Sequence, residues 1–179
     1  LPSPAMRVDS PLAEFPAAAA RLLDMEKPDF VHFHTFGLSE AALAALAKER
    51  GIRYGFTHHS PAWTCRRGTG LLYGNEPWDG EVRAWRCSAC QSEQRLGMGT
   101  PAGHAATAVS LGLGWAALPL GQNSIRRRTA FYYDTARFGR AIRRFLSECD
   151  LVVSCCDWSG PVLRRNGAVV RHYSSRLAY

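Results

Sequence analysis

The sequence predicts an α/β fold in which helices flank a parallel sheet, and three observations lead to it. Short apolar runs at 30–33 and 52–57 have the length and residue types of buried strands. The alanine-rich stretch 40–50 between them has helical spacing, and both links are short. A strand–helix–strand unit of this kind makes its two strands parallel. The helix 136–148 followed by a strand at 151–155 then repeats the alternation.

The remaining elements follow from local signals. Residues 12–25 have apolar side chains at helical spacing, which predicts a helix before the first strand. Ser39 is expected to be the N-cap of the helix 40–50. Asp157 or Ser159 is expected to open a last helix, which the pair at 166–167, Asn-Gly, ends.

Composition is that of an ordinary globular protein, with 179 residues, 46% hydrophobic and 21% charged. The net charge of +7 favours an anionic partner. Nothing in the sequence resembles a nucleic-acid module, and no aromatic residues alternate with the basic ones in a stacking pattern, so we expect no nucleic acid. Arginines at 126–128 and along the helix 136–148 indicate a solvated basic face. The apolar stretch 105–120 is too short to span a membrane, which leaves a buried helix or one at a membrane surface.

An insertion with little regular structure is predicted at about 60–123, rich in Gly, Trp and Cys near its start. A loop of this length needs a function or a staple. Cys65 and the C-x-x-C pair Cys87 and Cys90 offer three thiolates for zinc, which normally takes four ligands in structural sites. A redox pair and three free thiols are the alternatives. The other three cysteines, beside apolar sequence, are expected to be buried thiols: Cys149, Cys155 and Cys156.

Histidines stand where the predicted strands end. His34 follows the first strand, and His58 with His59 follows the second. Functional groups in parallel α/β sheets gather beyond the carboxyl ends of the strands. Alternation along a strand puts His58 and His59 on opposite sides, and His32 on the same face as His34. We expect His32 to be buried and structural, while ordinary polar residues at strand ends remain the alternative for His34 and His59.

Several motifs resemble those of family 4 glycosyltransferases. They are P-D-F-V-H-F-H at 28–34, F-T-H-H at 56–59 with a tryptophan and a cysteine soon after, and C-D-L-V-V-S at 149–154 with Asn-Gly at 166–167. The likeness extends, with gaps, from residue 28 to residue 167. It implies a Rossmann-like domain, the incomplete N-terminal, acceptor-side half of a GT-B fold. We expect the C-terminal, donor-binding domain to be absent from this chain, because its E-x7-E pattern is not found in the right context.

The resemblance also implies a chemistry. The chain would belong to a retaining glycosyltransferase of hexosyltransferase type that moves a sugar from a nucleotide-sugar donor to a glycan or lipid-linked acceptor, as in polysaccharide biosynthesis. His59 and His34 would be its catalytic residues, near the transferred sugar. A cytoplasmic location, extending to the inner face of the membrane, is expected because no signal peptide is visible. Structural zinc is less well supported, since the similar subset has a fourth cysteine where this chain has Trp78. The alternative is a non-catalytic Rossmann-like binding module with a metal-stapled loop.

Overall fold

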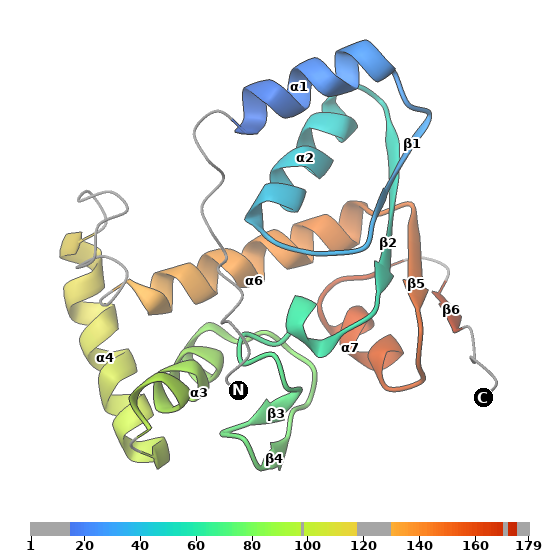
Figure 1. Ribbon diagram of the computed structural model, residues 1–179. Coiled ribbons are helices and arrows are strands. Elements are labelled where there is room, and N and C mark those ends of the chain that lie inside the picture. The colour runs from blue at the N-terminus through green and yellow to red at the C-terminus, as the bar shows by residue number, and fades with distance from the viewer. Residues whose placement is uncertain (1–14, 98, 118–129, 170–171, 175–179) are drawn as a thin grey trace. The chain divides into compact units, whose positions relative to one another are not determined.

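The structure, a computed structural model, describes residues 15–97, 99–117, 130–169 and 172–174 (Figure 1). The chain divides into two compact units. The first unit joins Leu1–Trp63 to Ala141–Tyr179, and the second is Thr64–Arg140. The insertion predicted at 60–123 falls mostly within the second unit.

The first unit is built on a four-stranded sheet whose strands are all parallel. Its strands, in the order β1-β2-β5-β6, are β1 Phe30–Phe33, β2 Arg53–His58, β5 Leu151–Ser154 and β6 His172–Ser174. The predicted parallel α/β fold is confirmed. In the register, Phe33 pairs with Phe56 and His58 pairs with Ser154. The carboxyl ends of β1, β2 and β5 therefore lie side by side at one edge of the sheet.

Helices α1 Phe15–Glu26, α2 Leu38–Glu49 and α7 Ser159–Arg165 complete this unit, with a short 3-10 turn η1 at Pro61–Trp63. Ser39 is not an N-cap, because α2 begins at Leu38 and its N-cap is Gly37. The polar contact before the helix comes instead from Thr35, whose hydroxyl donates to Glu40 Oε1 at 2.8 Å. Helix α2 therefore begins two residues earlier than the Ser39 signal suggested.

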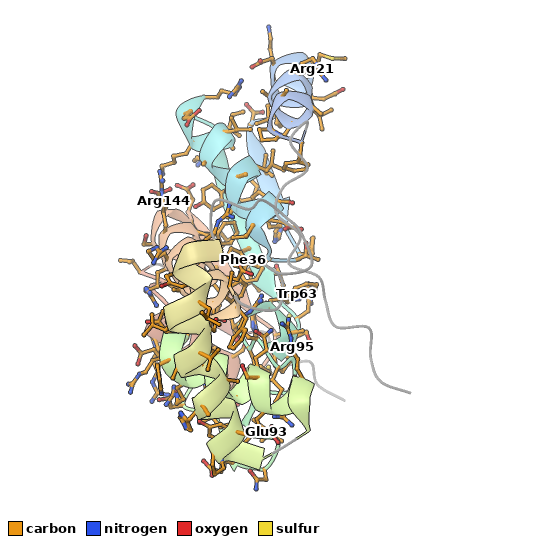
Figure 2. The ribbon with its side chains drawn as sticks, turned by 90° about the vertical axis from the view of Figure 1, so that its left-hand side faces the viewer. Arg21, Phe36, Trp63, Glu93, Arg95 and Arg144 are labelled. Carbon is orange, nitrogen blue, oxygen red and sulfur yellow. The ribbon has the colours of Figure 1, made fainter. Side chains whose placement is uncertain are left out.

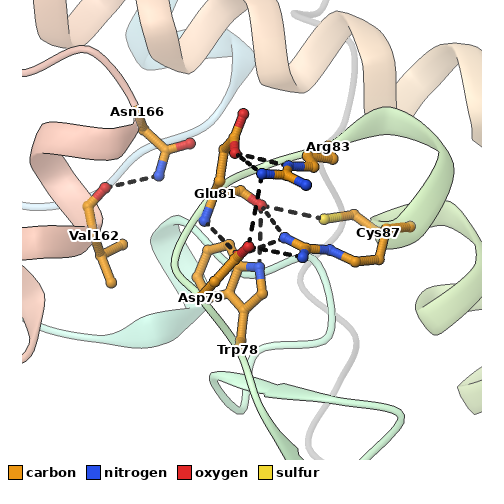
Figure 3. A network of polar contacts seen from close by, with 8 residues as sticks. Trp78, Asp79, Glu81, Arg83, Cys87, Val162 and Asn166 are labelled. Atoms are coloured by element: carbon orange, nitrogen blue, oxygen red, sulfur yellow. Dashed lines mark hydrogen bonds and ion pairs between the residues drawn. The ribbon is translucent and has the colours of Figure 1, made fainter.

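The end of α7 follows the sequence signal. Asn166 Nδ2 donates to the Val162 carbonyl at 2.8 Å (Figure 3). Gly167 follows with φ 101°, a left-handed conformation that glycine adopts without steric cost. Ser159, one of the two predicted starts, is the first residue of the helix.

The core of the first unit is a cluster of aromatic rings around Phe145, which is 2% exposed. Its ring centroid lies 5.0–5.5 Å from those of four neighbours: Phe33, Phe36, Tyr54 and Phe56. The Tyr54 hydroxyl also donates to the Phe145 carbonyl at 2.7 Å. These contacts join β1, β2 and the C-terminal part of α6 Phe131–Glu148.

The opposite face of α6 is basic and exposed, as its amphipathic pattern predicted. The exposed arginines are Arg137, Arg140, Arg143 and Arg144. Arg144 donates to Glu148 Oε1 at 3.0 Å (Figure 2). The arginines at 126–128 lie outside the described residues. Within the described ranges, no helix combines the length and apolar character that crossing a membrane requires.

The second unit has regular structure where little was predicted. It holds the hairpin β3 Leu71–Leu72 and β4 Glu76–Pro77, then α3 Ala84–Leu96 and α4 Gly99–Ala117. The prediction of a largely irregular insertion is therefore wrong for α3. The middle of α3 is buried on all sides and consists of small and polar residues, so no apolar stripe marked it as a helix: Cys87, Ser88, Ala89, Cys90, Gln91 and Ser92.

Helix α4, which covers most of the apolar stretch 105–120, also buries its small residues. Gly103, Thr107 and Ser110 are buried, whereas Val109 and Leu113 are 56% and 58% exposed. Gly103 is where α3 comes closest, because a Cβ built there would lie under 3.0 Å from the Ala89 carbonyl oxygen. Residues 118–120 of the predicted helical stretch lie outside the described part of the chain.

An ion-pair network holds the turn before α3 (Figure 3). Arg86 Nη1 donates to Asp79 Oδ2 at 2.8 Å, and the Glu81 amide donates to Asp79 Oδ1 at 3.1 Å. The hydrogen bond from Arg86 is the main cause that holds the pKa of Asp79 below its usual value.

We expect Asp79→Asn to lower stability near neutral pH by less than about 1 kcal/mol, because the Asp79 side chain is 38% exposed and solvent screens the pair. A lowered folded-state pKa means that this stability is present above the unfolded pKa and is lost as pH falls through the folded one. The difference from the natural protein should therefore shrink between pH 7 and pH 3 in urea unfolding. Asp24→Asn is the matched control in the exposed Asp24–Arg50 pair and should change stability less. A difference that grows toward low pH would contradict this origin.

Candidate functional site

Three strands of the first unit deliver polar side chains to one edge of the sheet. His34 is the residue after β1, His59 the residue after β2, and Cys155 the residue after β5. Because β1, β2 and β5 are hydrogen-bonded neighbours in register, the residues after them lie close together.

The two histidines singled out by the sequence are in direct contact. His34 Nδ1 lies 3.0 Å from His59 Nε2, a hydrogen bond in which one ring donates and the other accepts. The rings are stacked, with centroids 5.3 Å apart and planes at 19°. Both side chains are exposed, so a ligand can reach them. Their catalytic roles stay a prediction.

Cys155 is the site residue that sequence reasoning missed. It was expected to be buried, but it is only half-buried, and its Sγ lies 3.5 Å from His59 Nδ1. The strand-end rule applied to the histidines would have found it, since Cys155 follows β5 as His59 follows β2. Cys156 is half-buried as well, and only Cys149 is buried as expected.

His32 differs from its expected place. It was predicted to be buried, but its side chain is exposed, because β1 is at the edge of the described sheet and its even-numbered residues lie on an open face. Its Nε2 lies 2.7 Å from Thr57 Oγ1, and its ring stacks on His34 at 4.5 Å. Desolvation by these neighbours, followed by the charges of His34 and His59, lowers the pKa of His32.

His58 faces the interior, opposite to His59. It is fully buried, and its ring meets that of Trp158 edge-on at 5.6 Å. Burial lowers the pKa of His58 to about 4, so its imidazole is neutral near pH 7. Of the adjacent pair, only His59 is open to a ligand.

The candidate zinc ligands lie in the second unit. Cys65, Cys87 and Cys90 are buried free thiols. Burial raises the pKa of Cys87 to about 11. Cys90 Sγ accepts a hydrogen bond from the Tyr73 backbone amide at 3.1 Å. Over the part of the chain that the structure describes, no three His, Cys, Asp or Glu side chains are arranged to hold a metal ion. The described residues therefore do not fit a zinc site.

Comparison with known proteins identifies the family. The family model for Glycosyltransferase Family 4 matches residues 2–91, half of the chain. The chain belongs to glycosyltransferase family 4. Among curated proteins and among solved structures, no match is found. The part of this family 4 chain that matches includes β1, β2 and the His34–His59 pair, while Cys155 lies beyond it.

Proposed function

We propose that this family 4 chain provides the acceptor side of a retaining glycosyltransferase, which moves a sugar from a nucleotide-sugar to a hydroxyl of a glycan or lipid-linked acceptor. The observation that carries the proposal is the exposed His34–His59 pair at the carboxyl ends of two adjacent parallel strands. Parallel α/β sheets bind their ligands at such strand ends.

The hydrogen bonds suggest different roles for the His34 and His59 rings. Both nitrogens of His59 are engaged, Nε2 by His34 and Nδ1 by Cys155. His34 uses only Nδ1 within the described structure, so its Nε2 is open to a ligand. His34 Nε2 would then contact the acceptor hydroxyl, and His59 would orient the His34 ring. Imidazole suits this role because it donates or accepts hydrogen bonds near neutral pH.

A lipid-linked acceptor would place the protein at the inner face of the membrane. The exposed arginines of α6 support this, because an anionic lipid surface attracts a basic helix face. In this proposal, the chain binds the acceptor, and the nucleotide-sugar is held elsewhere in the enzyme.

The proposal is tested by histidine-ring NMR on the full chain. Short oligosaccharides, and lipid-linked sugars in micelles, are titrated while the ¹H–¹⁵N ring signals are followed. An acceptor should shift the signals of His34 and His59 and leave His104, in the second unit, unchanged. His34→Ala should weaken binding roughly tenfold, the loss of about one hydrogen bond to the ligand. His104→Ala is the matched control and should bind as the natural protein does.

A transfer assay with radiolabelled nucleotide-sugars then separates catalysis from binding. Transfer that falls in both His34→Ala and His59→Ala supports the enzyme. Because only the acceptor side is assigned to this chain, the assay mixture also contains a donor-binding domain of the family. Acceptor binding without transfer in that mixture would favour a non-catalytic binding module. If no sugar shifts either ring, the acceptor role is wrong.

A further inference from the structure

We propose that Cys155 is a reactive thiol that low-molecular-weight disulfides modify, with His59 as its base and His34 as the group that orients this base. The proposal goes beyond sugar transfer and does not depend on it. A nucleophile, a base in contact with it and a third group that holds the base are the parts by which an activated nucleophile is recognised.

The structure places the nucleophile, the base and the orienting group in successive contact. Cys155 Sγ lies 3.5 Å from His59 Nδ1, and the other nitrogen of the same ring lies 3.0 Å from His34 Nδ1. When His59 Nε2 donates to His34, its Nδ1 carries no proton and accepts the thiol proton of Cys155. Cys155 is also partly exposed, which gives a small disulfide access to the sulfur.

Two other cysteines on the same stretch of chain lack this arrangement. Cys156 is half-buried, as Cys155 is, but its thiol donates to the Ser159 hydroxyl at 3.6 Å. A serine hydroxyl is not a base at neutral pH. Cys149 is buried, its thiol donates to the Leu151 carbonyl at 3.1 Å, and burial raises its pKa to about 11. Position along the chain alone therefore does not predict reactivity.

The reaction is a thiol–disulfide exchange. The proton of Cys155 moves to His59 Nδ1, and the resulting thiolate attacks one sulfur of the disulfide RSSR. The Cys155–SR bond forms as the old S–S bond breaks, and the leaving RS⁻ takes the proton from the His59 imidazolium. The product is a mixed disulfide whose R group is attached beside His59.

The experiment measures the rate at which oxidised glutathione modifies each cysteine of the full chain at pH 7. Trypsin releases Phe145–Arg164, a peptide that holds Cys149, Cys155 and Cys156 with no internal Lys or Arg. Fragment ions in mass spectrometry then assign the adduct to one of the three. Cys155 should react roughly tenfold faster than Cys156, because only Cys155 has a base in contact that can take the thiol proton as the sulfur attacks.

Two variants test the cause. His59→Ala should bring the rate of Cys155 down to that of Cys156. His32→Ala is the matched control, because His32 belongs to the same histidine stack without touching the thiol, and the rate of Cys155 should stay within about twofold. Equal rates for the two cysteines, or a rate of Cys155 that His59→Ala leaves unchanged, would overturn the proposal.

Discussion

Replacing Phe145 with alanine is expected to lower the free energy of unfolding by about 3–5 kcal/mol, the range for a buried phenyl ring. Phe145 is 2% exposed and contacts four aromatic rings that come from β1, β2 and the segment before α2. Its removal leaves a cavity where these elements meet, and each neighbouring ring loses an edge-on or tilted contact.

Urea unfolding followed by circular dichroism measures the effect, and hydrogen exchange of the β2 and β5 amides locates it in the first unit. Phe145→Leu should cost less, because leucine fills part of the space. Leu22→Ala is the surface control, since Leu22 is 55% exposed, and its change should stay within about 0.5 kcal/mol. A Phe145→Ala protein as stable as the Leu22→Ala protein would show that the aromatic cluster is not the core.

Two glycines of α4 should respond to alanine in opposite directions. At Gly103 a Cβ would lie under 3.0 Å from the Ala89 carbonyl oxygen and 3.0 Å from Glu93 Cβ. Backbone cannot give way as a flexible side chain does, so α3 and α4 must separate, at an expected cost of about 1–3 kcal/mol. At Gly112 no atom of the described residues lies within 4 Å of the new Cβ. Gly112→Ala should instead stabilise the protein by about 0.5–1 kcal/mol, the difference in helix propensity.

Thermal unfolding of both variants tests the two predictions. Each variant is the control for the other, because both replace glycine with alanine in α4. The midpoint should fall for Gly103→Ala and rise for Gly112→Ala. Two shifts of the same sign would mean that propensity, and not the close approach of α3, determines the result.

Patterns that act over a few residues made most of the fold predictable. The apolar run Phe30–Phe33 and the helix and strand that follow it identified β1, α2 and β2. The helical connection between the two strands predicted that they are parallel. The same reasoning placed His34 and His59 at neighbouring strand ends, where the structure joins them by a hydrogen bond. Amphipathic spacing likewise predicted α6 with its arginines outward.

Features that depend on distant partners were missed. Helix α3 buries Ser88, Ala89 and Ser92 against another helix, and nothing in the local sequence marks such residues as a core face. The exposure of His32 follows from the position of β1 at the sheet edge, which one strand cannot reveal. The contact of Cys155 with His59 requires β5 to pair with β2, and that pairing is made by residues far apart in sequence.

The first unit is made of two segments of the chain, and the whole second unit lies between them in sequence. Tyr54 and Asp150 exchange hydrogen bonds across 96 residues, whereas Thr64–Arg140 is continuous and pairs neighbouring helices. During synthesis, that continuous unit emerges from the ribosome before β5 does, and its local contacts form quickly. We therefore expect the pairing of β5 with β2, which completes the sheet, to be the slow step of folding. Once Thr64–Arg140 has folded, β5 no longer has to find β2 across a long flexible loop. Mutations that weaken the α3–α4 pair should therefore also delay formation of the contact between Cys155 and His59.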